Sequence, residues 1–187
     1  MDLHWDVVAS ETVWRGRFQV VVDTLRAAHD GRELAYTYLG VRRGAVAVLA
    51  LDADRQVICV RQYRHPVRQV TLEIPAGHMD HDEDPAATAL REFEEETGLR
   101  LARVEPLGDY VPVPSLAGFT MHLYVGFDPA PGRQQLDGGE VLEVVCVPVR
   151  ALYAQVLAGE SQTAALNYAL LLARAKGYLP ELSDAAP

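Results

Sequence analysis

Cysteine, basic residues and long apolar runs are all scarce in this chain of 187 residues. Its two cysteines, Cys59 and Cys146, lie in apolar, strand-like runs, which predicts buried, reduced thiols without a functional role. Seventeen basic residues stand against twenty-six acidic ones, and the formal net charge is −9. The basic residues form no cluster. This disfavours nucleic acid as a partner, because proteins that track phosphate backbones need concentrated positive charge.

The apolar runs are too short for a membrane span. The longest cover residues 45–51 and 164–173, whereas a helix needs about 20 apolar residues to cross a bilayer. Residues 1–11 are acidic and lack the apolar stretch of a secretory signal. We therefore expect a cytoplasmic protein with no membrane partner. The 49% share of hydrophobic residues is typical of one globular domain with a sizeable core.

The clearest local pattern is a capped helix between Asp84 and Gly98. Asp84 suits the N-cap, the proline after it suits the first helical position, and Gly98 supplies the stop. At about 100° per residue, one arc of this helix carries mainly small or apolar side chains, and we expect it to face a core. The members of that arc are Ala86, Ala89, Leu90, Phe93 and Thr97.

An adjoining arc of the same helix carries Glu92, Glu95 and Glu96, a spacing that brings three carboxylates close together. Such like charges repel one another unless a cation or solvent screens them. Two interpretations follow. The arc is either a solvated acidic face, or a site for a hard divalent ion such as Mg²⁺, which takes oxygen ligands and recruits substrate phosphates. Arg91, four residues before Glu95, is spaced to hold that carboxylate in place.

The spacing of the candidate ligands argues against a calcium site and a zinc site. The alternating aspartates of residues 80–84 look like the start of a calcium-binding EF-hand loop, but Pro85 stands where glycine is needed and Arg91 where glutamate is needed. His78 and His81 have no further cysteine or histidine nearby in the sequence to complete a zinc site. We interpret both histidines as loop residues.

The wider segment, residues 77–99, resembles the complete Nudix box of the Nudix hydrolases. It reads Gly77, five residues, Glu83, seven residues, and then REFEEETGL from Arg91 onwards. The resemblance implies Mg²⁺ or Mn²⁺ as the cofactor. The metal ligands that it implies within the helix are Glu92, Glu95 and Glu96.

Segments outside the box resemble the ADP-ribose pyrophosphatase branch of that family, namely GAVAVLALD, RQYRHP and LEIPAG. In that branch the arginine of QYR lies near the substrate phosphates, which points to Arg64. The carbonyl of the alanine in PAG is a metal ligand there, which points to Ala76. From the residues alone, Arg64 has two equal roles, a fork on a phosphate oxygen or an ion pair with Glu73. Gly77 is small enough for an ion or diphosphate to approach the backbone.

Two later segments supply further candidates. The branch carries a proline about sixteen positions after the box glycine, and Pro114 stands there, although the chain reads PSLAG where Ser-Pro-Gly is common. Residues 127–140 are rich in proline, glycine and polar residues and predict a mobile surface loop. In the branch a loop glutamate before the last strand orients or deprotonates the reacting water. Glu140 is therefore the candidate general base, with Asp137 and Glu143 in reserve.

The N-terminal part reads as a β-hairpin, with β-rich stretches before and after the turn-like sequence HDGR. In the branch, N-terminal strands cross between subunits to build the adenine site. The resemblance therefore implies a homodimer and makes Trp14 a candidate for stacking on the base. The expected layout is a dimerising extension at 1–43, a Nudix hydrolase domain at 44–180 and a tail at 181–187.

The resemblance implies an α/β fold, an α/β/α sandwich with a mixed β-sheet and the N-terminal hairpin. The implied reaction is hydrolysis of ADP-ribose to AMP and ribose 5-phosphate, with Glu95 and Arg91 supporting catalysis beside Glu140. A bound cation would offset repulsion between an anionic nucleotide sugar and this acidic chain. Three alternatives stay open: a GDP- or UDP-sugar as substrate, oxidised nucleoside triphosphates as substrates, or a non-catalytic nucleotide-sugar sensor.

Overall fold

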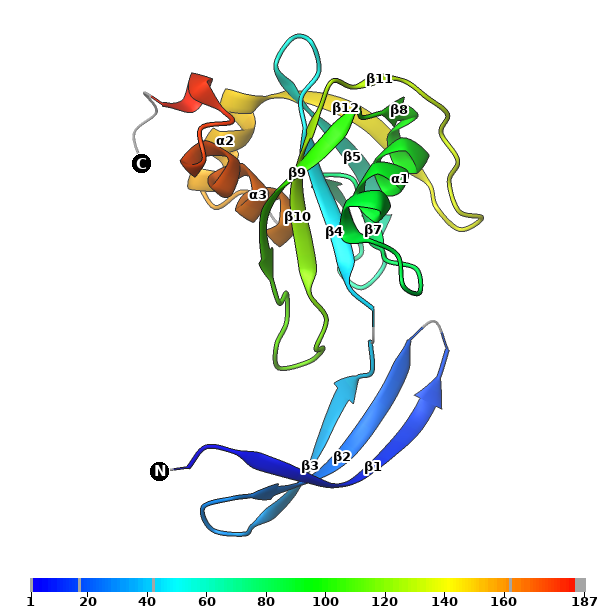
Figure 1. Cartoon of the computed structure of the whole chain (residues 1–187), viewed down its shortest axis with the longest axis vertical. Helices are drawn as coiled ribbons and strands as arrows, with labels where there is room; N and C mark the ends of the chain where they lie inside the picture. Colours follow the sequence, from blue (N-terminus) through cyan, green and yellow to red (C-terminus); the bar gives the residue numbers. More distant parts are fainter. Residues whose placement is uncertain (1, 17, 42, 162, 184–187) are drawn as a thin grey trace. The chain divides into compact units, whose positions relative to one another are not determined.

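The computed structural model describes residues 2–16, 18–41, 43–161 and 163–183 (Figure 1). The chain forms two compact units, and we describe each by itself. The N-terminal unit comprises Met1–Arg43 and Val111–Thr120, and the main unit comprises Gly44–Tyr110 and Met121–Pro187. Residues 184–187, which belong to the predicted tail, lie outside the described residues.

The N-terminal unit is an antiparallel sheet with the strand order β1-β2-β3. Its strands are β1 (Trp5–Arg15), β2 (Gln19–Ala27) and β3 (Glu33–Leu39). Strands β2 and β3 form the hairpin expected around HDGR, and β1 adds a strand beyond that expectation. The segment Val111–Thr120 joins this sheet, because the Leu39 N–H donates to the Leu116 carbonyl at 2.8 Å and the Tyr36 hydroxyl donates to the Ser115 carbonyl at 2.7 Å.

The main unit is built on short sheets with the orders β7-β4-β10-β9, β12-β5-β6 and β11-β8. Strand β10 runs parallel to β4 and antiparallel to β9, so the first of these sheets is mixed, as predicted. The strands are β4 (Ala45–Ala50), β5 (Gln56–Arg64), β6 (Gln69–Glu73), β7 (Ala76–His78), β8 (Leu99–Arg100), β9 (Arg103–Tyr110), β10 (Met121–Phe127), β11 (Ala130–Pro131) and β12 (Leu142–Pro148).

Helices cover both faces of strand β4, with α1 on one face and α2 and α3 on the other (Figure 1). The helices are α1 (Pro85–Thr97), α2 (Val149–Leu157) and α3 (Ala164–Ala175), followed by the short 3₁₀ helix η1 (Pro180–Leu182). All six residues of β4 are buried, because alternate side chains of a strand point to opposite faces and both faces are covered. Val48 packs with Phe93 of α1, whereas Leu49 packs with Leu170 of α3.

Helix α1 begins and ends at the residues that the sequence indicated. The Asp84 carboxylate accepts hydrogen bonds from the N–H groups of Ala86 at 2.9 Å and Ala87 at 3.1 Å. Gly98 ends the helix with φ 70°, in the left-handed region that favours glycine. Phe93, on the predicted core arc, is fully buried. The helix therefore has a fixed start, a fixed end and one anchored face.

The prediction of two buried cysteines was correct for Cys59 and wrong for Cys146. Cys59 is buried on the inner strand β5, and burial raises the pKa of its thiol to about 12. Cys146 is exposed, because β12 is an edge strand of its sheet and only part of that strand is covered. In the parts of the chain that the structure describes, no helix combines the length and the apolar character needed to span a bilayer.

The N-cap of α1 gives a first test. We expect Asp84→Ala to lower the free energy of unfolding by about 1 kcal/mol, because two N–H groups lose their acceptor. The matched control is Asp54→Ala, which removes the same side chain from an exposed turn. Urea unfolding followed by circular dichroism measures both variants, and equal losses in the two would contradict the capping role.

Candidate functional site

The side chain of Arg91 gathers three carboxylates at the surface of α1. Its guanidinium donates to Glu83 at 3.0 and 2.9 Å, to Glu92 at 2.8 Å and to Glu95 at 2.8 Å. The hydrogen bonds to Glu83 contribute most to raising the pKa of Arg91, and they hold the pKa of Glu83 down at about 2. The sequence paired Arg91 with Glu95 alone. The structure shows that Arg91 also holds Glu92 and Glu83.

Glu96 differs from its neighbours because it is buried, with 4% of its surface exposed. Burial raises the pKa of its carboxyl group to about 8, against an ordinary value of 4.5. The Ala76 N–H donates to its Oε2 at 3.1 Å, which partly offsets that rise. Burial also raises the pKa of Glu92, to which the charges of Glu95 and Glu140 add. These carboxylates are held where their negative charge is unfavourable.

The short strand β7 carries the Ala76–Gly77 backbone directly past this face of α1. A Cβ atom added to Gly77 would lie 2.0 Å from the Glu92 side-chain carbon Cδ, far inside van der Waals contact. Glycine is therefore required if the strand is to run this close to the carboxylates. The structure brings Ala76 close to Glu96 and Gly77 close to Glu92, and their role in a shared site stays a prediction.

Arg64 forms the ion pair with Glu73 that was one of its two open roles. Its Nε and Nη2 donate to the two carboxylate oxygens at 2.8 and 2.7 Å, and the Thr71 hydroxyl donates to the same carboxylate at 2.6 Å. Glu73 contributes most to raising the pKa of Arg64, and the charges of Glu96 and Glu140 add to it. A guanidinium has five N–H donors, so this pair leaves donors for a second anion. The phosphate role stays a prediction.

Glu140 lies near the acidic cluster, at the end of a loop. The Glu140 N–H donates to the Asp137 carbonyl at 2.8 Å, and the Asp137 N–H donates to the Glu140 carboxylate at 3.2 Å. The negative charge of Glu140 contributes to the raised pKa values of Glu92 and Glu96. By contrast, the reserve candidate Glu143 accepts a hydrogen bond from Arg61 at 3.1 Å. The choice of Glu140 among the three loop acids stays a prediction.

Trp14 and Pro114 belong to the N-terminal unit. Trp14 is half exposed, and its ring centroid lies 5.7 Å from that of Phe18. Pro114 belongs to the segment that joins the β1-β2-β3 sheet. Their roles in substrate binding remain predictions.

The donor chemistry of the cluster fits a hard divalent ion. Its side-chain ligand atoms are carboxylate oxygens, Gly77 lets the Glu92 carboxylate lie close to the β7 backbone, and a nearby cation would lower the cost of ionising the buried Glu96. Across the described ranges, no three or more histidine, cysteine, aspartate or glutamate side chains are grouped so that they could hold a metal ion. In the arrangement seen, Arg91 holds Glu92 and Glu95.

A further part of the site was missed by the sequence, which predicted a mobile loop for all of residues 127–140. Strand β11 pairs with β8, so the first half of this segment is not free. The main-chain N–H groups of Gly132 and Gln135 donate to the carbonyls of Gly98 and Glu95, at 2.8 and 2.9 Å. The composition gives no sign of these bonds, because they are made mainly by the backbone.

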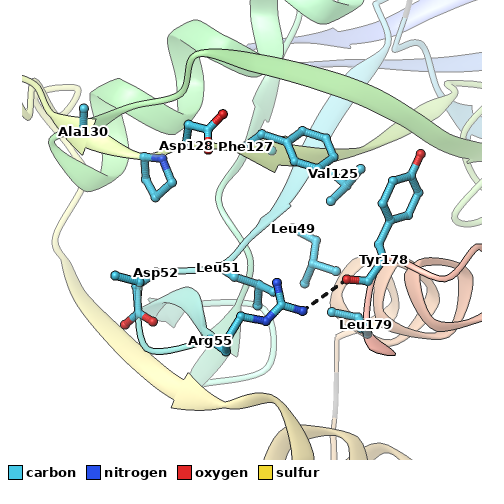
Figure 2. A pocket seen from close by; sticks show the side chains of 13 residues that line it. Leu49, Leu51, Asp52, Arg55, Val125, Phe127, Asp128, Ala130, Tyr178 and Leu179 are labelled. Atoms are coloured by element: carbon cyan, nitrogen blue, oxygen red, sulfur yellow. Dashed lines mark hydrogen bonds between the residues drawn. The ribbon is translucent and has the colours of Figure 1, made fainter. Parts of the chain in front are cut away.

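A cavity of about 580 Å³ lies away from the cluster, at the carboxyl ends of β4 and β10 (Figure 2). Leu49 and Val125 border it from the strands, and Arg55 reaches across one side to donate to the Tyr178 carbonyl at 3.3 Å. Among the described residues that line it there is no candidate site residue. The β7 backbone and the acidic face of α1 adjoin the other end of β4, where Ala76 pairs with Ala47.

Comparison with known proteins agrees with this geometry. An ADP-ribose pyrophosphatase of Bacillus subtilis is 33% identical over 129 residues, which cover 68% of this chain and 70% of that protein. A methanol dehydrogenase activator of Bacillus methanolicus is 39% identical over 104 residues, which cover 54% of this chain and 56% of that protein. The latter match thus spans little more than half of its relative.

A solved structure described as an ADP compounds hydrolase superposes on this chain with a TM-score of 0.84, at 25% sequence identity, and the match covers 98% of each chain. This likeness confirms the predicted fold class. The model of the NUDIX domain family matches residues 41–167, which is more than half of the chain and includes the whole acidic face of α1. The chain therefore belongs to the Nudix domain family.

Proposed function

We propose that this protein is a metal-dependent pyrophosphohydrolase that cleaves ADP-ribose to AMP and ribose 5-phosphate. The observation that carries the proposal is the cluster of carboxylates on α1 against the Ala76–Gly77 backbone, in a member of the Nudix family. The likeness to an ADP-ribose pyrophosphatase and to an ADP compounds hydrolase supports the choice of substrate. In the reaction, water adds to one phosphorus of the diphosphate and the bridging P–O bond breaks.

We assign one role to each group of the site. Glu92, Glu96 and the Ala76 carbonyl would hold Mg²⁺ or Mn²⁺, and Glu95 would support a further ion. When bound, such an ion neutralises phosphate charge and makes water more acidic. Arg91 orients the carboxylates of Glu92 and Glu95, to which it is already bonded.

The remaining two groups act on water and phosphate. Glu140 orients or deprotonates the attacking water, a role supported by the effect of its negative charge on the pKa values of Glu92 and Glu96. Arg64 binds a phosphate oxygen with the N–H groups that its pair with Glu73 leaves available. The same pair holds the guanidinium in one orientation before substrate arrives.

The carboxylates give the first activity test. We expect Glu95→Gln and Glu96→Gln each to lower kcat by about 10²-fold or more, since loss of a metal ligand should cost at least as much as loss of an outer-shell partner. The control is Glu160→Gln, at an exposed turn in the same chain. Turnover of ADP-ribose with saturating Mg²⁺ measures the effect, and circular dichroism checks the fold. Near-parental turnover in either variant would refute the ligand assignment.

The burial of Glu96 gives a second test, in which we expect a gain in stability rather than a loss of activity. In protein stripped of metal with EDTA, we expect Glu96→Gln to raise Tm by a few degrees. The pKa of the buried Glu96 is raised to about 8, so at pH 7 the parent must take up a proton on this carboxyl group as it folds, which costs stability. A neutral amide of the same shape avoids this cost and still accepts the Ala76 N–H. Differential scanning calorimetry at pH 7 measures this difference. A lower Tm than that of the parent would show that the charge is compensated in the metal-free fold.

The substrate is tested with a panel of ADP-ribose, GDP-mannose, UDP-glucose, diadenosine polyphosphate and 8-oxo-dGTP, each with Mg²⁺ and with Mn²⁺. We expect ADP-ribose to give the highest kcat/KM, with AMP and ribose 5-phosphate as the products identified by chromatography. Preference for a GDP- or UDP-sugar would move the proposal to that substrate class. Metal-dependent turnover of any member would exclude the non-catalytic sensor.

We further propose that residues 1–43 form a dimerising extension of a hydrolase domain at 44–180, followed by a short tail. In the N-terminal unit, Val7, Val13 and Trp14 are each more than half exposed, which is unfavourable for apolar side chains in a monomer. Trp14 would stack on adenine in such a dimer, and Pro114 would line the substrate loop. A cytoplasmic location stays a prediction of the sequence.

The oligomeric state tests the extension. We expect light scattering to give about twice the 20.6 kDa mass of the chain for the parent, and the monomer mass for Val13→Glu, because a buried carboxylate would oppose the contact. The control is Val67→Glu, at an exposed valine of the main unit. A parent that is monomeric at micromolar concentration would overturn the dimer.

A further inference from the structure

The carboxyl end of α1 is covered by a segment that we call the capping strap, residues 130–135. A helix leaves its last four carbonyls without partners inside the helix. The strap supplies partners from outside. Gln135 N–H bonds to the Glu95 carbonyl at 2.9 Å, and Gly132 N–H bonds to the Gly98 carbonyl at 2.8 Å. In addition, the Gln134 side-chain amide donates to the Glu96 carbonyl at 2.7 Å.

The strap lies close against the helix end and holds it at several points. A Cβ atom added to Gly98 would lie 3.3 Å from the Gln134 main-chain nitrogen, tighter than most Cβ contacts. The Arg133 N–H also donates to the Glu94 carboxylate at 3.3 Å. The carbonyls of Glu95 and Glu96, two of those that the strap partners, belong to proposed metal ligands. The strap thus restrains the backbone from which both carboxylates project.

The strap also leads directly into the loop that carries Glu140. Asp137, two residues after Gln135, begins the turn that is closed by bonds between Asp137 and Glu140. A shift of the strap along α1 would therefore move Glu140 relative to Glu96. Gln134 is the strap residue that grips the helix through its side chain, whereas Gly132 and Gln135 do so through main-chain N–H groups that any residue except proline supplies.

We propose that Gln134 is a positioning residue, which fixes the Glu140 loop against the metal-binding turn of α1. The inference rests on the proposed function, since it assigns Gln134 to the same site. A positioning residue differs from a purely structural helix cap in the effects expected when it is replaced. A cap contributes only to stability, whereas a positioning residue sets the distance between the ligands and the base.

The variants are Gln134→Ala, which removes the donor, and Gln134→Glu, which keeps the shape but places an acceptor beside the Glu96 carbonyl. Their matched controls are Gln135→Ala and Gln135→Glu, which change the adjacent glutamine and keep its main-chain N–H. The first readout is steady-state kinetics of ADP-ribose hydrolysis. We expect both Gln134 variants to lower kcat roughly 10-fold, with KM for ADP-ribose little changed and a higher Mg²⁺ concentration for half-maximal activity. The controls should match the parent.

The second readout needs no turnover. Hydrogen–deuterium exchange of the metal-free protein should show faster exchange in residues 135–140 for Gln134→Ala than for Gln135→Ala. Mn²⁺ binding, followed by electron paramagnetic resonance of the free ion, should weaken several-fold in the Gln134 variants. If the parent does not hydrolyse ADP-ribose, the proposed function fails while these two measurements still decide the role of Gln134.

Clear outcomes would overturn the inference. A Gln134→Ala variant with kcat, exchange and Mn²⁺ affinity within twofold of the parent would show that the side-chain bond positions nothing. A lower Tm with unchanged kcat and Mn²⁺ affinity would reduce Gln134 to a helix cap. Equal losses in the Gln134 and Gln135 variants would assign the effect to the strap as a whole rather than to the Gln134 amide.

Discussion

Repulsion among the carboxylates on one helical face is the constraint on which the rest of this structure depends. Glu92, Glu95 and Glu96 lie within two turns of α1, and Glu83 joins them from the preceding loop. One guanidinium, that of Arg91, is bonded to three of these four groups. Glu96 is the fourth, and it is buried. Burial nevertheless makes the negative charges of Glu92 and Glu96 unfavourable in the protein alone, and a bound cation would offset that cost.

The fold supplies the rigidity that this unfavourable arrangement requires. Strand β4 is buried on both faces, and Phe93 fixes α1 against one of them. Gly77 then lets β7 pass close to Glu92, and the Ala76 N–H reaches Glu96. A more mobile helix would relax by turning its carboxylates toward water. The apolar core and the two flanking contacts prevent this. The packing of the domain therefore keeps the carboxylates of the site in place.

The features that the sequence predicted correctly are those decided by neighbours in the chain. The start of α1 at Asp84, its end at Gly98 and the burial of Phe93 follow from capping and helical period. Burial of Glu96 did not follow, because Glu96 lies on the acidic arc of the helix and its contact with Ala76 of β7 joins residues twenty positions apart. Cys146 was misplaced for a similar reason, since the edge position of β12 is a property of the sheet.

The capping strap shows the same limit for hydrogen bonds. Its residues are those of an exposed loop, and most of its bonds to α1 come from the backbone, which composition cannot reveal. Under the proposal, these bonds hold the loop that carries Glu140. The pattern of the Nudix box lies within one helix and its approach, so it contains the proposed metal ligands but not the residues proposed to place a base opposite them. Glu140 is far from the box in sequence and is connected to it through Gln134 and Gln135.

A segment that binds the helix end through its backbone can change its side chains without losing these hydrogen bonds. The composition of such a segment is thus free to vary. A substitution at Gln134, by contrast, removes the hydrogen bond from its side-chain amide to the Glu96 carbonyl.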